Sequence, residues 1–311
     1  MNSEEIWTGR VDGTDPEQLR WHQVVAPYVP GGEPGACVFV GFASDEGVRR
    51  NTGRPGAAQG PDALRRALAP MALPAPLRAY DAGTITVTDG RLEDGQRRLG
   101  TTVTALLDAG EFPVVFGGGH EVAVGTYLGL AGSTRRAPGS VLGILNLDAH
   151  FDLRPDPIAS SGTPFRQILE ADADVRYAVL GVSQPSNTAA LFATADRFGA
   201  RYLLDDDCAE PARVDAFVTE FLARIDLLYL TIDLDVLPAA VAPGVSAPAA
   251  FGVGLPVVQA VCDRVTASGL LAVTDIAELN PGLDPDARTA RTAARLAHRL
   301  VTRHVPGPPQ K

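Results

Sequence analysis

The sequence has no apolar run of about 18 residues or more, and its first residues, Met1 to Trp7, are polar. A membrane-spanning helix needs such a run, and a secretory signal needs an apolar segment behind a basic start, so neither is expected. Only three cysteines are present, Cys37, Cys208 and Cys262, and they are scattered along the chain. An odd, scattered set of cysteines is typical of a reduced, cytoplasmic protein with buried thiols.

Basic charge is also scarce. The chain has 27 lysines and arginines but 37 aspartates and glutamates, which gives a net charge of −10. Nucleic acid needs a basic face, so it is not an expected partner. The 311 residues contain no low-complexity linker and no internal repeat. We therefore expect a single domain over 1–311, with a polar lead-in at 1–34 and a core from about 36 to 304.

Short apolar runs recur along the chain, and segments with helix signals lie between them. The predicted strands are Ala36–Phe42, Pro113–Phe116, Val141–Leu147, Tyr177–Val182, Tyr202–Leu204, Asp226–Ile232 and Leu270–Ile276. Helices are predicted from Gly60-Pro61 onward and at Ser186–Gly199, Leu255–Ser268 and Asp284–His304, with a short one around Pro16–Val25. Continuous apolar strands that alternate with helices predict an α/β fold with a doubly wound parallel sheet.

Acidic and imidazole side chains follow two of these strands and a run of three glycines. Side chains two residues apart on a strand point the same way, so each group aims at one place. The candidate metal ligands are His120, Asp148, His150, Asp152, Asp233 and Asp235. Four crowded carboxylates repel one another, and two divalent cations would cancel their charge. The set therefore predicts a two-metal hydrolytic site.

The spacing within the first acidic stretch adds a geometric condition. In a straight strand Asp148 and Asp152 would lie about 13 Å apart, at about 3.3 Å per residue. Metal ions in a pair lie about 3.5–4 Å apart, so the chain must curl directly after Asp148. The alternative for each aspartate is a turn residue or a helix cap, which would not explain why both stretches and His120 occur together.

Carboxylates with two imidazoles suit manganese, iron or zinc, and we expect a pair of manganese ions. Water held between two metals loses a proton near neutral pH and becomes a nucleophile. The glycines at 117–119 could instead form a phosphate loop, but no Gly-Lys-Ser/Thr follows them. Glu121 is expected to hold a metal ligand in orientation.

Other polar residues are candidates for binding a substrate. Glu278 follows the run Leu270–Ile276, where a carboxylate could hold a cationic group by a charged hydrogen bond. Asn51 and Arg54 follow the first strand, Arg154 follows the metal motif and Arg166 lies further along. Arginine pairs with carboxylates through two hydrogen bonds, so several arginines suggest an acidic substrate.

These motifs, in this order, resemble those of the arginase–agmatinase (ureohydrolase) family from about Gly41 to Pro281. The stretches that match are Gly-Gly-Gly-His-Glu, Asn-Leu-Asp-Ala-His-Phe-Asp, Asp-Leu-Asp and Glu-Leu-Asn-Pro. The resemblance implies a three-layer α/β/α fold with an eight-stranded, mostly parallel sheet, two manganese ions per subunit and a homo-oligomer, often a trimer or hexamer. It implies that His120 and Asp152 bind one metal, that His150 and Asp235 bind the other, and that Asp148 and Asp233 bridge them.

One departure from the family pattern bears on the substrate. Arginases and agmatinases carry a histidine before a glycine in the loop after the metal motif, and here that residue is Ser161. The surrounding stretch, which includes Thr163 and Arg166, is similar to the branch that hydrolyses N-formimidoyl-L-glutamate to L-glutamate and formamide in histidine degradation. The resemblance then implies a small amidine substrate with two carboxylates, Asp152 and Glu278 as catalytic residues, and substrate contacts from Asn51, Arg54, Arg154, Ser161, Thr163, Arg166 and Glu278.

Three alternatives are weighed against this interpretation. A related amidine or guanidine substrate stays open within the family. A dinuclear metallophosphoesterase usually places Asp-x-His early and an Asn-His pair after it, and this sequence has no such pair. A non-catalytic metal-binding protein would usually have lost a ligand or Glu278, and none is missing.

Overall fold

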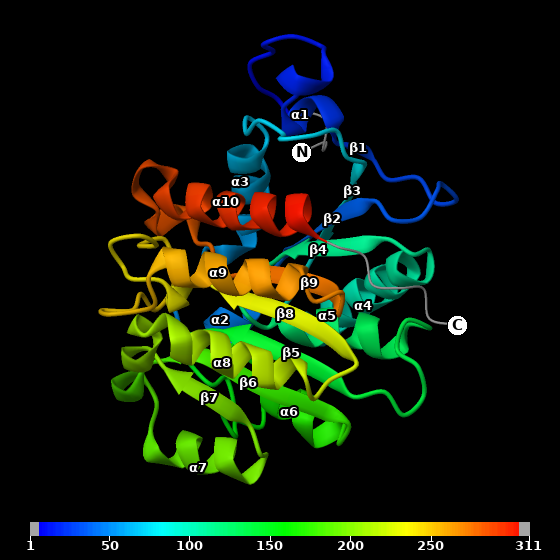
Figure 1. Ribbon diagram of the computed structural model, residues 1–311. Helices are drawn as coiled ribbons and strands as arrows, with labels where there is room; N and C mark the ends of the chain where they lie inside the picture. The colour runs from blue at the N-terminus through cyan, green and yellow to red at the C-terminus, as the bar shows by residue number, and fades with distance from the viewer. Residues whose placement is uncertain (1–5, 305–311) are drawn as a thin grey trace.

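Nine parallel strands form one sheet at the centre of the computed structural model, which describes residues 6–304 (Figure 1). Every strand pair in the ladder is parallel. In sheet order the strands are β1 (Ala26–Pro27), β3 (Ala79–Thr86), β2 (Cys37–Ala43), β4 (Phe112–Phe116), β9 (Leu271–Ala277), β8 (Leu227–Asp233), β5 (Leu142–Leu147), β6 (Val175–Val182) and β7 (Arg201–Leu204). The family resemblance implies eight strands, and the two-residue β1 at the edge makes the ninth.

The central strands form where the sequence is continuously apolar. Every residue of β4, β5, β8 and β9 is buried, as expected for strands covered on both faces. Alternate side chains enter two separate cores, so Phe39 faces one side of the sheet while Val38 and Val40 face the other. All seven predicted strands are confirmed within two residues at each end.

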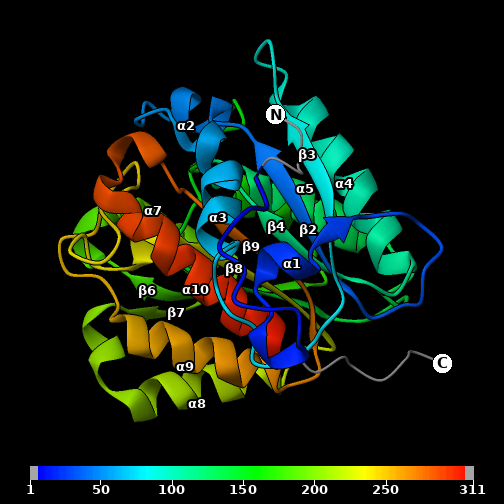
Figure 2. The same ribbon diagram turned by 90° about the horizontal axis from the view of Figure 1, so that it is seen from above.

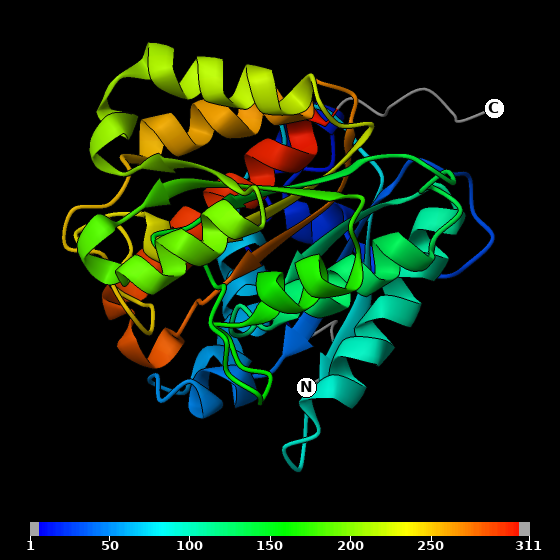
Figure 3. The ribbon, with the colours of Figure 1, turned by 90° about the horizontal axis from the view of Figure 1, so that it is seen from below.

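Helices cover both faces of the sheet, which gives the expected three layers (Figures 2 and 3). One core lies under α3 (Gly60–Leu68), α8 (Pro211–Leu222), α9 (Leu255–Thr266) and α10 (Arg288–Arg303). The other lies under α4 (Leu92–Asp108), α5 (Val122–Gly132), α6 (Pro164–Ala171) and α7 (Ala189–Arg197). The short α2 (Glu46–Arg50) follows β2 at the carboxyl edge of the sheet.

The predicted helices are present, with three changes. The short helix predicted around Pro16–Val25 is instead a 3-10 turn (Pro16–Gln18) followed by α1 (Trp21–Val24). Helix α7 begins after Thr188, because Ser186 belongs to a 3-10 turn that Pro185 initiates. Helix α10 begins at Arg288, although the Asp284 carboxylate still accepts hydrogen bonds from the backbone N–H groups of Thr289 and Ala290, at 2.7 and 2.9 Å. Helix α3 begins at the predicted Gly60-Pro61, and helix α9 begins at the predicted Leu255.

The N-terminal lead-in is fastened to the sheet by its two tryptophans. It contains a 3-10 turn (Pro16–Gln18), α1 (Trp21–Val24) and β1. Trp21 is fully buried and its Nε1 donates to His298 Nδ1 on α10, at 3.0 Å. Trp7 Nε1 donates to the buried Asp81 carboxylate on β3, at 2.7 Å. The lead-in therefore adds to the core, although its composition is polar.

Two further predictions concern the chain as a whole. All three cysteines are buried and unpaired, as expected. Within residues 6–304, no helix combines the length and the hydropathy that a membrane crossing requires.

Candidate metal centre

Four neighbouring strands at the centre of the sheet bring the predicted metal ligands to one edge. In sheet order these strands are β4, β9, β8 and β5, and their carboxyl ends lie together because all are parallel. This is the edge at which open α/β sheets place their ligands. The turn after β4 carries His120, and the loop after β5 carries Asp148, His150 and Asp152. Strand β8 ends with Asp233, the 3-10 turn after it carries Asp235, and Glu278 follows β9.

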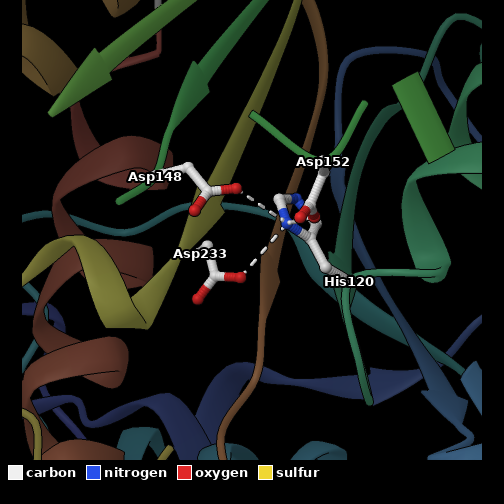
Figure 4. A group of neighbouring side chains, drawn as sticks. All are labelled: His120, Asp148, Asp152 and Asp233. Atoms are coloured by element: carbon white, nitrogen blue, oxygen red, sulfur yellow. Dashed lines mark ion pairs between the residues drawn. The ribbon is translucent and has the colours of Figure 1, made fainter. Parts of the chain in front are cut away.

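Three carboxylates converge on the imidazole of His120 (Figure 4). His120 Nδ1 lies 3.2 Å from Asp148 Oδ2, 3.0 Å from Asp152 Oδ2 and 3.1 Å from Asp233 Oδ2. Nδ1 is buried and makes no hydrogen bond within the described residues. An imidazole nitrogen and three carboxylate oxygens that face one point can hold one divalent cation.

A second group of ligands shares Asp148 with the first. His150 Nδ1 lies 3.0 Å from Asp235 Oδ2 and 3.5 Å from Asp148 Oδ1, so the two oxygens of Asp148 face different groups. The three residues can hold a second cation. Asp233 belongs to the first group alone, because its Oδ1 accepts the backbone N–H of Asp235 at 2.8 Å. Bridging by Asp148 matches this geometry, and bridging by Asp233 stays a prediction.

The protonation of these groups reflects their crowding. Burial, together with the charge of Asp148, raises the pKa of Asp152 to about 6. Burial also raises the pKa of Asp233 well above its usual value, and the charges of Asp235 and Asp148 add to that rise. Burial alone would lower the pKa of His120, but the nearby carboxylates of Asp148, Asp152 and Asp233 raise it well above 6.5. Protons thus take the place that cations would fill.

The predicted curl after Asp148 is present. The strand ends at Leu147, and Asp152 has a left-handed backbone with φ of 50°, which returns its side chain toward His120. Asn187 fixes this loop, since its side chain accepts the N–H of Phe151 and donates to the carbonyl of Ala149, at 3.1 and 2.9 Å. A non-glycine residue at positive φ is strained, so the loop is built for the position of the carboxylate.

Glu278 also has a left-handed backbone, with φ of 69°. Its Oε1 accepts the backbone N–H of His120 at 2.9 Å, while its buried Oε2 has no hydrogen-bond partner among residues 6–304. Burial raises the pKa of Glu278 to about 8, and the charge of Glu121 contributes. An unpartnered carboxylate oxygen in a cavity is suited to a cationic ligand group.

The cavity over these residues has a volume of about 370 Å³. Its walls include four of the predicted substrate residues besides Glu278, namely Asn51, Arg54, Arg154 and Ser161. Thr163 and Arg166 do not reach it, which corrects that part of the prediction. Thr163 is buried and its hydroxyl accepts the backbone N–H of Ser160, whereas Arg166 pairs with Glu170 at 2.9 Å along α6. The helix-start signal Thr163-Pro164 could have shown this from the sequence.

The two arginines on the cavity wall differ in their partners. Arg54 donates through Nε and Nη2 to the carbonyls of Ser246 and Val245, at 2.8 and 2.7 Å, so its guanidinium fastens one loop to another. Arg154 is exposed, and its guanidinium contacts no hydrogen-bond or ion-pair partner within the part of the chain that the structure describes. Arg154 is therefore the cation available to an acidic ligand.

Glu121 has a different role from the one expected. Its Oε1 accepts hydrogen bonds from the hydroxyl of Ser44 and the backbone N–H of Gly47, at 2.8 and 2.9 Å. Burial raises the pKa of Glu121 to about 7, although these hydrogen bonds oppose the rise. Glu121 thus fixes the start of α2 rather than a metal ligand.

Several cavity residues were not predicted. The connection between β6 and α7 contributes Ser186, Asn187 and Leu191, and a later loop contributes Ser246 and Ala247. The motif at the end of β6, Gly181-Val-Ser183-Gln-Pro, carried a signal for the first group, because it leads out of a strand of the same sheet. No motif marks the second loop.

Comparisons with known proteins agree with this geometry. The sequence pattern of the Arginase family matches residues 35–302. The chain is 77% identical over 303 residues to the formimidoylglutamase of Nocardia farcinica (strain IFM 10152), with 97% of each chain covered.

Solved structures resemble the whole fold. The crystal structure of Trypanosoma cruzi formiminoglutamase with Mn2+2 is 29% identical, has a TM-score of 0.79, and the match covers 86% of this chain and 93% of that one. The formimidoylglutamase of Bacillus subtilis subsp. subtilis str. 168 is 20% identical and has the same fold, with a TM-score of 0.83 and coverage of 96% and 97%.

Proposed function

The chain belongs to the arginase family, and we propose that it hydrolyses N-formimidoyl-L-glutamate to L-glutamate and formamide in histidine degradation. The observation that carries this proposal is one cavity with two ligand groups for metals and Glu278 at its base, and with the free guanidinium of Arg154 on its wall. The substrate has matching ends, since its formimidoyl group is cationic and its glutamate part has two carboxylates. The full-length relative from Nocardia farcinica supports the same substrate.

The two ligand groups fit a pair of manganese ions. His120, Asp152 and Asp233 would hold one ion, His150 and Asp235 the other, and Asp148 would contact both. The unpartnered Nδ1 of His120 and the excess of carboxylates support a cation at this place. When bound, the two ions supply Lewis-acid activation of water and of the amidine carbon.

Glu278 orients the substrate over the metal centre. Its Oε1 is fixed by the N–H of His120, which leaves Oε2 to accept hydrogen bonds from the cationic formimidoyl nitrogens. As the amidine carbon becomes tetrahedral, its nitrogens no longer share the positive charge, and a nitrogen that holds a full proton forms a stronger charge-assisted hydrogen bond with the carboxylate. Glu278 thereby lowers the barrier as well as binding the ground state.

Asp152 is the residue that we assign to proton transfer. Its Oδ2 faces His120, while its Oδ1 has no hydrogen-bond partner within residues 6–304. Oδ1 takes the proton of the attacking water and passes it to the glutamate nitrogen as the carbon–nitrogen bond breaks. The hydroxyl proton of the tetrahedral carbon is lost as the carbonyl forms and also goes to the glutamate nitrogen, so the products are neutral formamide and glutamate with a protonated amino group.

The mouth of the cavity selects the other end of the substrate. Arg154 receives one carboxylate, and Asn51 and Ser161, whose side chains are joined by a 3.2 Å hydrogen bond, offer further polar contacts. Ser161 also replaces the histidine of arginases, so the site has no imidazole there to move protons for a guanidine substrate. Arginine and agmatine should therefore be poor substrates.

Two further properties remain proposals. A cytoplasmic location rests on the three buried, unpaired cysteines. A homo-oligomer rests on the family resemblance alone.

The test is a substrate panel with the manganese-loaded protein. We expect glutamate release from N-formimidoyl-L-glutamate, and slow or no hydrolysis of arginine, agmatine and guanidinobutyrate. Efficient hydrolysis of arginine or agmatine would overturn the substrate and leave the metal chemistry intact. No hydrolysis of any amidine or guanidine would favour a non-catalytic metal-binding protein.

A further inference from the structure

We propose that Asp275 is a positioning residue, which acts through Thr231 to hold the imidazole of His120 with its bare Nδ1 toward the metal ligands. This inference rests on the proposed metal centre. It concerns residues behind that centre, in the interior of the sheet, that touch neither a metal ligand group nor the cavity except through His120. Their arrangement follows from the pairing of β8 with β9, the yellow and orange strands of Figure 1.

The first contact in this arrangement fixes one side of the imidazole. His120 Nε2 lies 2.9 Å from the hydroxyl oxygen of Thr231. A histidine that binds a metal through Nδ1 must carry its single hydrogen on Nε2. The required tautomer is therefore the one in which Nε2–H donates and the Thr231 oxygen accepts.

The neighbour of Thr231 in the sheet decides whether its hydroxyl oxygen can accept this hydrogen bond. Thr231 on β8 is the register partner of Asp275 on β9, and the Asp275 side chain is fully buried. Burial raises the pKa of Asp275, and the charge of His120 opposes that rise. The Tyr229 hydroxyl donates to Oδ2, and the buried Oδ1 has no hydrogen-bond partner among residues 6–304, so Oδ1 is open to the hydrogen of the neighbouring Thr231 hydroxyl.

An ionised carboxylate can only accept hydrogen bonds, so it fixes the direction of the whole series. Thr231 must donate its hydrogen to Asp275, and its oxygen must then accept from His120 Nε2. The reverse tautomer would leave two unprotonated atoms, His120 Nε2 and the Thr231 oxygen lone pair, facing each other in a buried site. Asp275 thus keeps a proton away from Nδ1 without touching a metal.

His150, the imidazole of the second ligand group, lacks this support. Its side chain is 28% exposed, and no residue in the described part of the chain forms a hydrogen bond with its Nε2. The two metal sites should therefore differ in their dependence on buried neighbours. Loss of the Asp275 support should weaken the metal at His120 and spare the metal at His150.

The test uses substitutions that keep shape and change hydrogen bonding. In Asp275→Asn the amide can donate to Thr231 and reverse the series, and in Thr231→Val the hydroxyl is lost. We expect each to weaken one of the two manganese sites by about 10- to 100-fold in a titration that follows free Mn2+ by electron paramagnetic resonance. Thr231→Ser keeps the hydroxyl and should retain both sites at wild-type affinity.

Thr274→Val is the matched control for a loss of packing or polarity in this sheet. Thr274 precedes Asp275 on β9, is fully buried, and its hydroxyl has no hydrogen-bond partner within residues 6–304. Its manganese affinity should equal that of the wild type. The metal-free forms of all variants should melt cooperatively, so that a change in affinity is not a failure to fold.

The outcomes separate the two proposals. Two wild-type sites in Asp275→Asn and Thr231→Val would overturn the positioning role and leave the proposed function standing. An equal loss of manganese affinity in Thr274→Val would overturn it too, because any change in the buried part of the sheet would then weaken metal binding. If Asp275→Asn does not fold, the manganese affinities of Thr231→Val and Thr231→Ser decide whether the positioning role stands. Equal affinities in these two variants would overturn it. A wild-type protein that binds no manganese would overturn the proposed function itself.

Discussion

Replacing Arg154 with glutamine should raise KM for N-formimidoyl-L-glutamate and leave kcat close to its wild-type value. A charge-assisted hydrogen bond contributes about 1.5–3 kcal/mol, which corresponds to about 10- to 150-fold at about 1.4 kcal/mol per factor of ten. Because Arg154 is exposed, water screens the pair and the effect should lie near the lower end, about tenfold. In the proposed binding mode the reacting carbon lies at the metal ligands and Arg154 contacts a carboxylate at the other end of the substrate, so ground state and transition state should lose the same contact.

The assay is steady-state glutamate release, with Arg166→Gln as the matched control. Arg166 lies outside the cavity and pairs with Glu170 on α6, so its loss should not change KM. N-formimidoyl-4-aminobutyrate, which lacks the α-carboxylate, shows which carboxylate Arg154 holds. For that compound, wild type and Arg154→Gln should have equal KM if Arg154 binds the α-carboxylate.

Three results would refute this reasoning. An unchanged KM for formimidoylglutamate in Arg154→Gln would mean that the carboxylates are held elsewhere on the cavity wall. An equal rise in Arg166→Gln would mean that net charge attracts the substrate, without a direct contact. A large fall in kcat in Arg154→Gln would place the side chain closer to the chemistry than the structure does.

Three more predictions concern the metal centre. Asp233→Ala should lose bound manganese, and its activity should fall by several orders of magnitude. Metal analysis and turnover measurements would check this, and two retained metals with normal turnover would contradict the ligand set. Glu278→Gln should lower mainly kcat, because the lost contact strengthens in the transition state, and an unchanged kcat would remove Glu278 from the mechanism. Folding raises the pKa of Asp152 to about 6 and of Glu278 to about 8, mainly through burial. Their protonation stabilises the fold at low pH, and this stability is lost as the pH rises through those values. The Tm of metal-free protein should then fall between pH 5 and pH 8.5, and manganese should abolish that fall. A Tm of the metal-free protein that does not change with pH would contradict the crowding of carboxylates.

The sequence predicted the central strands because their burial on both faces requires continuous apolar runs. It missed β1 and β3, which lie near the sheet edge. In β3 buried residues such as Ala79 and Asp81 alternate with partly exposed ones, and β1 has only two residues, both exposed. Strands of this kind form because a neighbouring strand offers hydrogen bonds, and that neighbour is not visible in the local sequence.

The metal ligands could be predicted because strand geometry alone directs them. Residues at the carboxyl ends of adjacent parallel strands meet whatever the loops do, as His120 and Asp233 do here. The substrate side could not be predicted in the same way, since a loop arginine can turn in any direction. Arg54 bonds to backbone carbonyls, Arg166 pairs within its own helix, and only Arg154 among the three is left for a ligand.

The left-handed backbone at Asp152 and Glu278 has a consequence for any attempt to engineer this protein. Each residue is held in a conformation that costs about 1–3 kcal/mol and that glycine would adopt freely. Glycine at either position would also remove a carboxylate from a crowded cluster, so Asp152→Gly and Glu278→Gly should melt at higher temperature than the metal-free wild type. A library selected for heat resistance alone, without a screen for turnover, would therefore enrich inactive proteins first.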